Sequence, residues 1–229
     1  MNPRDPNVQL VEVVTERLGS LAARVVLVGG CTTGLLITDL ARPPARATVD
    51  VDLIAETISL IAYYELQREL KALGFKEDTE LTCRWRLGEL RIDVVPTDER
   101  ILGFTNRWYG RTMQQAQQHR LPSGKQIRVI SPPLFIATKL DAFHSRGNGD
   151  YGASHDIEDI IAVVDGRSEL VEEIANADQD VRSYIQEELD DLLGELAFTS
   201  TLGYHLAGDA ANQRRIPLII ERLRSIAGI

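Results

Sequence analysis

The sequence predicts an α/β (α+β) protein, with a mixed sheet flanked by helices followed by an all-helical C-terminal region. Up to residue 131, short aliphatic runs typical of strands alternate with segments whose apolar residues have the spacing of a helix. After Pro132-Pro133, only segments with helical spacing of apolar residues follow. The chain has 229 residues, of which 44% are hydrophobic and 26% charged, enough to bury a core. We therefore expect an α/β domain at residues 1–131 and a helical domain at residues 132–229.

The elements of the N-terminal region follow from apolar spacing and from glycine or proline at their ends. Pro43-Pro44 ends the second helix, and Gly88-Glu89 forms the turn of a hairpin. Residues 97–115 are expected to be irregular. Helices are expected at 8–23, from Thr32 or Thr33 to 41, and at 60–73. Strands are expected at 25–28, 48–54, 81–87 and 90–95, and in a second hairpin at 119–130.

The C-terminal region repeats helical spacing without any strand pattern. Helices are expected at 134–146, 155–164, 169–177, 181–196 and 213–226. Residues 150–195 contain fifteen Asp and Glu against two Lys and Arg, whereas residues 84–128 contain nine Lys and Arg against four Asp and Glu. The formal net charge of −9 argues against general nucleic-acid binding, while the basic segment allows a local phosphate-binding surface.

The same composition favours a cytoplasmic protein without a membrane segment. No apolar run approaches the roughly 18 residues that a transmembrane helix requires, and the N-terminus lacks a signal-peptide pattern. The two cysteines, Cys31 and Cys83, lack the spacing of a metal site and are expected to be reduced.

Three aspartates on predicted strands are the main candidates for catalysis. Asp50 and Asp52 stand two apart in one strand, so their carboxylates share a face at about 7 Å along the backbone. Asp93 stands in the second strand of the first hairpin. Carboxylates held together repel each other unless a hard cation binds them. The pattern predicts a site for Mg²⁺ or Mn²⁺ at Asp50, Asp52 and Asp93, with a phosphate-bearing substrate.

A glycine pair upstream indicates where the phosphates bind. Gly29-Gly30 joins a strand to a helix, where the bare backbone and the helix N-terminus suit a phosphate group. The lysine that a P-loop requires is absent, because Leu35-Leu36 stands in its place. Arg46 and Thr48 precede the aspartate pair and are candidate nucleotide-binding residues. The alternative for these two is a surface arginine and a strand-favouring threonine.

This ordered set of motifs resembles the nucleotidyltransferase superfamily of the polymerase-beta type. The resemblance covers roughly residues 25–95. It implies that Gly29 and Gly30 contact the triphosphate of an NTP, and that Asp50, Asp52 and Asp93 hold two metal ions. A nucleoside monophosphate then passes to an acceptor hydroxyl, and pyrophosphate leaves.

A second set of residues resembles the C-terminal half of the AbiEii-type and minimal nucleotidyltransferase toxins. Lys139 stands in an apolar helix, and Asp156 and Asp159 follow on the next helix, three residues apart. The resemblance implies that Lys139 and one of these aspartates complete the nucleotide site. His155 stands where a lysine commonly precedes the aspartate, so the choice between Asp156 and Asp159 stays open. The structural alternative is a buried Lys–Asp pair that joins the two helices.

The predicted function is therefore metal-dependent nucleotidyl transfer from an NTP. The resemblance implies a tRNA end or a protein as the acceptor, and a toxin–antitoxin system with an antitoxin as partner. The first alternative is an adenylyltransferase that modifies a small molecule such as an antibiotic, whose acceptor cleft is acidic when the acceptor is a cation. The second alternative is a catalytically silent regulatory protein of the same fold.

Overall fold

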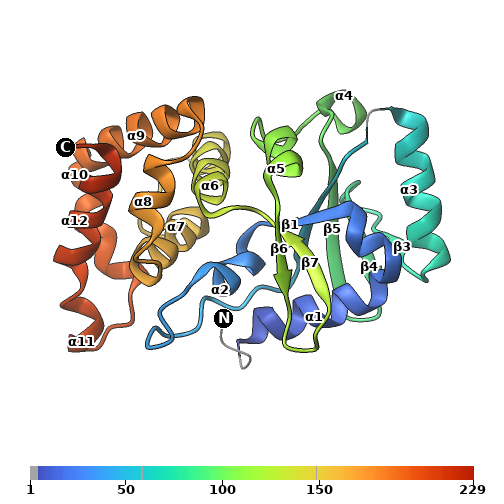
Figure 1. Cartoon of the computed structure of the whole chain (residues 1–229), viewed down its shortest axis with the longest axis horizontal. Helices are drawn as coiled ribbons and strands as arrows, with labels where there is room; N and C mark the ends of the chain where they lie inside the picture. Colours follow the sequence, from blue (N-terminus) through green and yellow to red (C-terminus); the bar gives the residue numbers. More distant parts are fainter. Residues whose placement is uncertain (1–4, 58, 148) are drawn as a thin grey trace. The chain divides into compact units, whose positions relative to one another are not determined.

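A computed structural model describes residues 5–57, 59–147 and 149–229 of the chain (Figure 1). The chain divides into two compact units. We call residues 5–34 together with Arg46–Ser131 the sheet unit. Leu35–Ala45 together with Pro132–Ile229 form the helical unit.

The sheet unit is built on a seven-stranded mixed sheet, which confirms the predicted fold class. Its strand order is β3-β4-β5-β2-β1-β7-β6. β2 is parallel to β5 and antiparallel to β1, and β1 is parallel to β7. The strands are β1 (Val25–Val28), β2 (Val51–Ala55), β3 (Lys76–Glu77), β4 (Arg84–Leu87), β5 (Leu90–Pro96), β6 (Gln117–Arg120) and β7 (Gln126–Val129).

The central strands form the core of this unit. All four residues of β1 are buried, which explains why its sequence is a continuous apolar run without alternation. Helix α1 (Pro6–Leu18) contacts β2, and its first turn is capped by Asp5, which accepts a hydrogen bond from the backbone N–H of Asn7. The 3₁₀ helix η1 (Gly19–Arg24) then leads into β1.

Helix α3 (Leu60–Ala72) agrees with the spacing of its sequence. The Ser59 hydroxyl accepts a hydrogen bond from the Ala62 N–H, so Ser59 is the N-cap. Gly74 follows the C-cap with a φ of +90°, a conformation that glycine adopts without strain.

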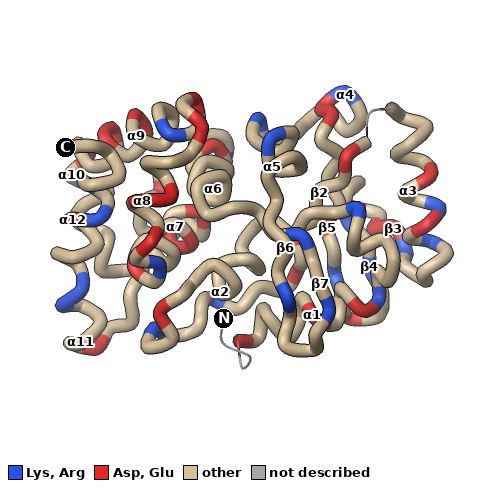
Figure 2. Tube along the Cα trace, viewed as in Figure 1, with Lys and Arg blue, Asp and Glu red and all other residues tan. Residues whose placement is uncertain are grey.

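The helical unit contains the helices that follow Pro132. Helix α6 contacts α7, α8 and α9, and α12 contacts the same three helices, so α6 and α12 organise the core. Acidic positions recur along α8 and α9 (Figure 2). The helices are α6 (Pro132–Arg146), α7 (His155–Gly166), α8 (Leu170–Ala175), α9 (Gln179–Gly194), α10 (Leu196–Thr201), α11 (Ala210–Gln213) and α12 (Ile216–Ala227).

Two sequence-based expectations are wrong. Residues 97–115 are not irregular but contain α4 (Glu99–Leu102) and α5 (Tyr109–Gln115). The first of them, α4, is capped by Asp98, which accepts a hydrogen bond from the Arg100 N–H. Both helices are too short to show a helical period.

The helix expected to reach residue 41 ends early. After β1 the chain forms η2 (Gly30–Thr32) and α2 (Thr33–Leu36). The backbone N–H groups of Thr38 and Asp39 both donate to the Gly166 carbonyl, each at 3.0 Å, instead of extending the helix. A tertiary contact within the helical unit therefore overrides local helical propensity.

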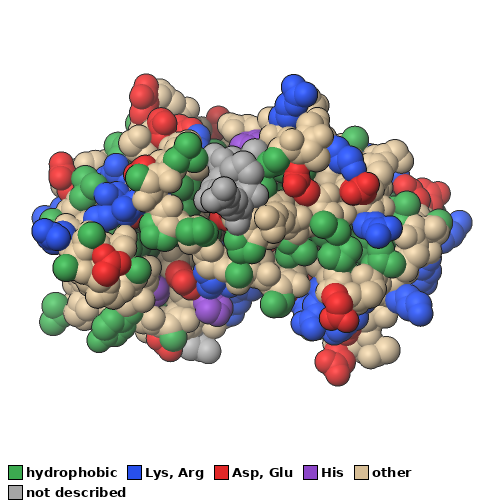
Figure 3. Space-filling view, turned by 90° about the horizontal axis from the view of Figure 1, so that it is seen from below, with side chains coloured by type: hydrophobic (Ala, Val, Ile, Leu, Met, Phe, Trp, Pro, Cys, Tyr) green, Lys and Arg blue, Asp and Glu red, His purple; other side chains and the backbone are tan. Residues whose placement is uncertain are grey.

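Two properties bear on the environment of the chain. None of the helices in the described residues is long and apolar enough to cross a membrane. On the face drawn in Figure 3, acidic and basic side chains are interspersed with apolar ones, so neither sign of charge dominates that face.

Candidate active site

The sheet register brings the predicted aspartates to one place. Asp52 on β2 is the direct partner of Asp93 on the parallel strand β5. Asp93 is in turn the direct partner of Arg84 on the antiparallel strand β4. Directly paired residues point to the same face of a sheet, so the three side chains share one face. The strand expected at 48–54 begins only at Val51, so Asp50 lies one residue before β2 and not within the strand.

Arg84 binds two of these carboxylates. Its Nε and one Nη donate to the two oxygens of Asp93 at 2.7 and 2.8 Å, and the same Nη donates to Asp50 Oδ2 at 2.8 Å. Hydrogen bonds from Arg84 to Asp93 raise the pKa of the guanidinium above its ordinary value, against the opposing effect of burial. We call Asp50, Asp52, Asp93 and Arg84 the carboxylate cluster.

Gly29 is required by the Asp52 side chain. A Cβ added at Gly29 would lie 1.9 Å from Asp52 Oδ2, and Gly29 has a φ of +71°. The pairing of Val28 with Asp52 places this turn beside the aspartate. Gly29 therefore makes room for a carboxylate of the cluster, a role that sequence reasoning did not assign to it.

Two threonines after the glycine pair are buried. The Thr32 hydroxyl donates to the Gly29 carbonyl at 2.6 Å. The Thr33 hydroxyl, also fully buried, has no hydrogen-bond partner within the residues that the structure describes. A buried polar atom of this kind marks a place where a water or ligand group is expected.

Asn7 holds the segment that leads into Asp50. Its side-chain Nδ2 donates to the Arg46 carbonyl at 2.8 Å, and its Oδ1 accepts from the Thr48 N–H at 2.8 Å. The Thr48 hydroxyl donates to the Asp50 carbonyl at 3.2 Å. Asn7 is fully buried and was missed from the sequence. Its position four residues before Val11, on the apolar face of α1, was the available signal.

Cys83 lies beside the carboxylate cluster. Burial and the charges of Asp93 and Asp52 raise the pKa of its thiol to about 11. The thiol is therefore protonated at neutral pH, the form that is a weak nucleophile.

The donors of the cluster suit a hard divalent cation. Carboxylate oxygens are the ligands that Mg²⁺ and Mn²⁺ prefer, and Asp52 and Asp93 are paired across two strands. Among residues 5–57, 59–147 and 149–229, no group of three His, Cys, Asp or Glu side chains is already arranged to hold a metal. Arg84 supplies positive charge to the cluster instead.

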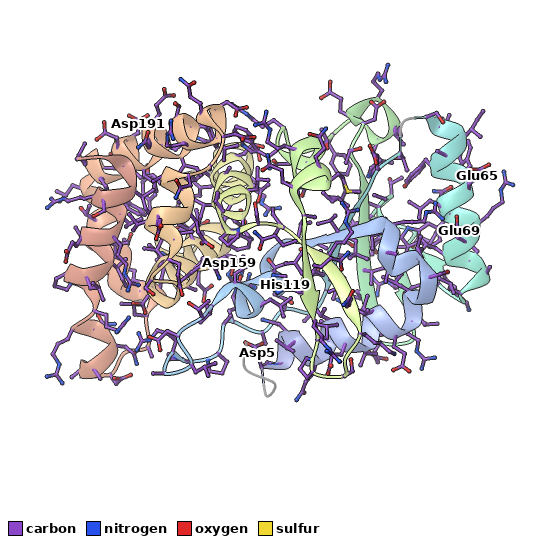
Figure 4. All side chains as sticks on the ribbon, in the orientation of Figure 1. Asp5, Glu65, Glu69, His119, Asp159 and Asp191 are labelled. Atoms are coloured by element: carbon purple, nitrogen blue, oxygen red, sulfur yellow. The ribbon has the colours of Figure 1, made fainter. Side chains whose placement is uncertain are left out.

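The helical unit contains a second cluster. Lys139 on α6 donates from Nζ to Asp156 at 3.0 Å and to Asp159 at 2.6 Å, both on α7. Arg146 donates two hydrogen bonds of 2.9 Å to Asp156. We call these four residues the lysine cluster; Asp159 is labelled in Figure 4. Lys139, Asp156 and Asp159 are 6%, 5% and 2% exposed.

The pKa shifts of this cluster follow from charge pairing. Burial alone lowers the pKa of Lys139, but the charges of Asp159 and Asp156 outweigh burial and raise it. Burial raises the pKa of Asp156, but the Arg146 hydrogen bonds and the Lys139 charge bring it below its ordinary value. Lys139 and Asp156 are therefore held in their charged forms.

The predicted site residues thus gather in two sets, each inside its own unit. The sheet unit holds Gly29, Gly30, Arg46, Thr48, Asp50, Asp52 and Asp93, and the helical unit holds Lys139, Asp156 and Asp159. Arg84 and Asn7 are the residues of the sheet unit that sequence reasoning missed.

The helical unit also contains a cavity of about 370 Å³. Its lining combines the aromatic rings of Phe143 and Tyr151 with acidic side chains, including Asp191 on α9 (Figure 4). His144, another lining residue, contacts Glu188. The remaining lining residues are Gly149, Leu192 and Glu195.

Comparison with known proteins shows similarity at the level of fold. No family model and no curated protein sequence matches the chain. A solved structure of an antigenic nucleotidyltransferase-like protein from Paracoccidioides brasiliensis is 21% identical, with a TM-score of 0.52 over 87% of this chain and 92% of that one. The protein therefore has the fold of a nucleotidyltransferase-like protein.

Two further structures have lower TM-scores. The antibiotic-resistance factor ANT(2'')-Ia is 15% identical, with a TM-score of 0.45 over 68% of this chain and 81% of that one. A putative nucleotidyltransferase from H. pylori is 13% identical, with a TM-score of 0.48 over 100% of this chain and 95% of that one.

Proposed function

We propose that the protein is a metal-dependent nucleotidyltransferase that moves a nucleoside monophosphate from an NTP to an acceptor hydroxyl. The observation that carries the proposal is the pairing of Asp52 with Asp93 on one sheet face, beside the Gly29 turn. This places two carboxylates next to a backbone turn of the kind that phosphates approach. The nucleotidyltransferase-like fold supports the same function.

The cluster residues would bind the metal and handle the proton. Asp50, Asp52 and Asp93 would hold Mg²⁺ or Mn²⁺, with two ions as the proposed stoichiometry. When bound, the metal neutralises the phosphate charge and stabilises the leaving pyrophosphate. The acceptor oxygen bonds to the α-phosphorus as the bond from that phosphorus to the β-phosphate oxygen breaks. Asp93 accepts the hydroxyl proton, and Asn7 keeps the Asp50 segment in position.

The proposed acceptor is a hydroxyl of a tRNA end or of a protein, in a toxin with an antitoxin as partner. The order of motifs supports this choice, because Lys139, Asp156 and Asp159 follow the carboxylates as in the AbiEii-type toxins. The proposal includes Arg46, Thr48, Lys139 and one of the two aspartates as nucleotide-binding residues.

A second candidate is transfer to a hydroxyl of a cationic small molecule, as in antibiotic adenylylation. The cavity of the helical unit favours it, because aromatic rings and carboxylates together suit ammonium groups. Glu188, Asp191 and Glu195 supply the negative charge of this lining.

One labelling experiment tests both candidates. The protein is incubated with each α-³²P-labelled NTP, Mg²⁺ and cell extract, and the RNA, protein and small-molecule fractions are separated. Label in RNA or protein supports the first candidate, and label in small molecules supports the second. The folded Asp52→Asn variant is the control. Absence of both label transfer and pyrophosphate release with all four NTPs contradicts the proposed function.

A further inference from the structure

We infer that the Arg84 guanidinium occupies the metal site of the carboxylate cluster, and that a divalent ion binds there by displacing the guanidinium. The inference rests on the proposed function, because it assumes that the same carboxylates hold the metal. Arg84 is thus a positioning residue of the metal-free state: it holds Asp50 and Asp93 in place and has to leave them when the ion arrives.

The hydrogen bonds of Arg84 occupy the oxygens that a metal would need. Both oxygens of Asp93 accept from the guanidinium, at 2.7 and 2.8 Å, and Asp50 accepts from it at 2.8 Å. A divalent ion on Asp93 would sit about 2.0–2.6 Å from its oxygens, within close range of the guanidinium charge. Repulsion at this range makes occupation by Arg84 and by the ion mutually exclusive.

The fold places Arg84 there and also allows it to leave. The β4–β5 register fixes Arg84 opposite Asp93, so strand pairing sets the position of Arg84 at the cluster. β4 lies one strand from the edge of the sheet, and the Arg84 side chain keeps 17% of its surface exposed.

A neighbouring arginine provides a matched control. Arg86 lies two residues further along β4 and pairs with Asp78, outside the carboxylate cluster. Its side chain is 44% exposed. Removing Arg86 therefore removes one positive charge from the same strand without releasing Asp50 or Asp93.

The test is calorimetric titration of the nucleotide-free protein with Mn²⁺ alone. Arg84→Met should bind Mn²⁺ at least about tenfold more tightly than the wild type, because charge-assisted hydrogen bonds no longer compete. Arg86→Met should match the wild type. Arg84→Lys keeps the positive charge but loses the bidentate hydrogen bonds to Asp93, so its affinity for Mn²⁺ should be intermediate.

Thermal unfolding gives a second readout and covers the case of a poorly folded variant. In EDTA, Arg84→Met should unfold at a lower temperature than the wild type, because its carboxylates repel each other. Mn²⁺ should remove this difference in unfolding temperature, because it binds the folded state. Arg84→Lys serves if Arg84→Met does not fold.

The outcomes separate this inference from the proposed function. Wild-type binding of Mn²⁺ with no gain in the Arg84 variants overturns only the inference. Absence of Mn²⁺ binding in the wild type and in the Arg84 variants overturns both the inference and the metal site. Tighter binding in the Arg84 variants without nucleotidyl transfer by the wild type supports the inference and rejects the function.

Discussion

The carboxylate cluster and the lysine cluster differ in charge balance and in exposure. The lysine cluster joins two cations to two carboxylates, and Lys139 and Asp159 are almost fully buried. The carboxylate cluster contains three carboxylates and one arginine, which binds two of them, and the Asp50 side chain is 28% exposed. A charge-balanced cluster whose lysine and two carboxylates are buried, with Arg146 reaching Asp156 from the surface, is suited to joining two helices. Excess negative charge near solvent is suited to binding an incoming cation.

The largest effect is expected at the lysine cluster. Lys139→Met leaves Asp156 and Asp159 buried without their shared ammonium group, which should lower the free energy of unfolding by roughly 3–5 kcal/mol. Urea denaturation measures this change. Lys125→Met is the control, since Lys125 pairs with Glu16 in an exposed bridge worth about 0–1 kcal/mol. Wild-type stability with lost activity in Lys139→Met would contradict the structural role and leave only the proposed nucleotide-binding role of this lysine.

The opposite behaviour is expected at the carboxylate cluster. Asp52→Asn keeps the shape of the side chain but weakens the metal site, so pyrophosphate release should fall about 10²–10³-fold. Urea denaturation of the same sample should show little change in stability. A stability loss as large as that of Lys139→Met would remove the distinction between the clusters.

A smaller effect is expected at the glycine turn beside Asp52. Gly29→Ala combines a positive φ with a Cβ 1.9 Å from Asp52 Oδ2, and should cost about 1–3 kcal/mol of stability. Gly88→Ala is the matched control, because Gly88 has a φ of +59° and nothing within 4 Å of an added Cβ. The two losses, measured by urea denaturation, should differ. Equal losses would show that Asp52 does not press on this turn.

The smallest effect is expected for the contribution of Asp156 to stability at acidic pH. Hydrogen bonds from Arg146 and the charge of Lys139 hold the pKa of Asp156 below its ordinary value, despite burial. Asp156 therefore stabilises the fold above its unfolded pKa of about 3.9, and this contribution disappears as the pH falls through the lower folded pKa. The stability difference between wild type and Asp156→Asn should shrink as the pH falls below about 4. A difference that is constant with pH contradicts this linkage.

The sequence was sufficient to predict the fold class and the strands that carry Asp52 and Asp93, because those features are local. Apolar and polar residues alternate around Asp52 and around Asp93, and residues 25–28 form one apolar run. Each of these patterns can be recognised within a single segment of the sequence. Arg84 was missed because its role depends on register across two strands, which no single segment fixes. Asn7 was missed for a similar reason, since its partners lie 39 and 41 residues away.

The short helices of residues 97–115 and the early end of α2 were missed for other reasons. α4 depends on one capping aspartate, and α2 ends because Thr38 and Asp39 bind the Gly166 carbonyl. The metal ions, the nucleotide and the acceptor stay predictions, because they depend on ligands rather than on the chain alone.

The segment Leu35–Ala45 belongs to the helical unit although it lies in sequence between β1 and β2 of the sheet unit. It binds that unit through the Gly166 carbonyl and through the 2.7 Å contact of Arg42 with Asp165. Neither unit is therefore one continuous stretch of chain. The ribosome makes this segment long before the helices that bind it, so the helical unit is completed only late in synthesis. Gene fusion or recombination at a single breakpoint cannot transfer either unit whole, and the two are constrained to be inherited together.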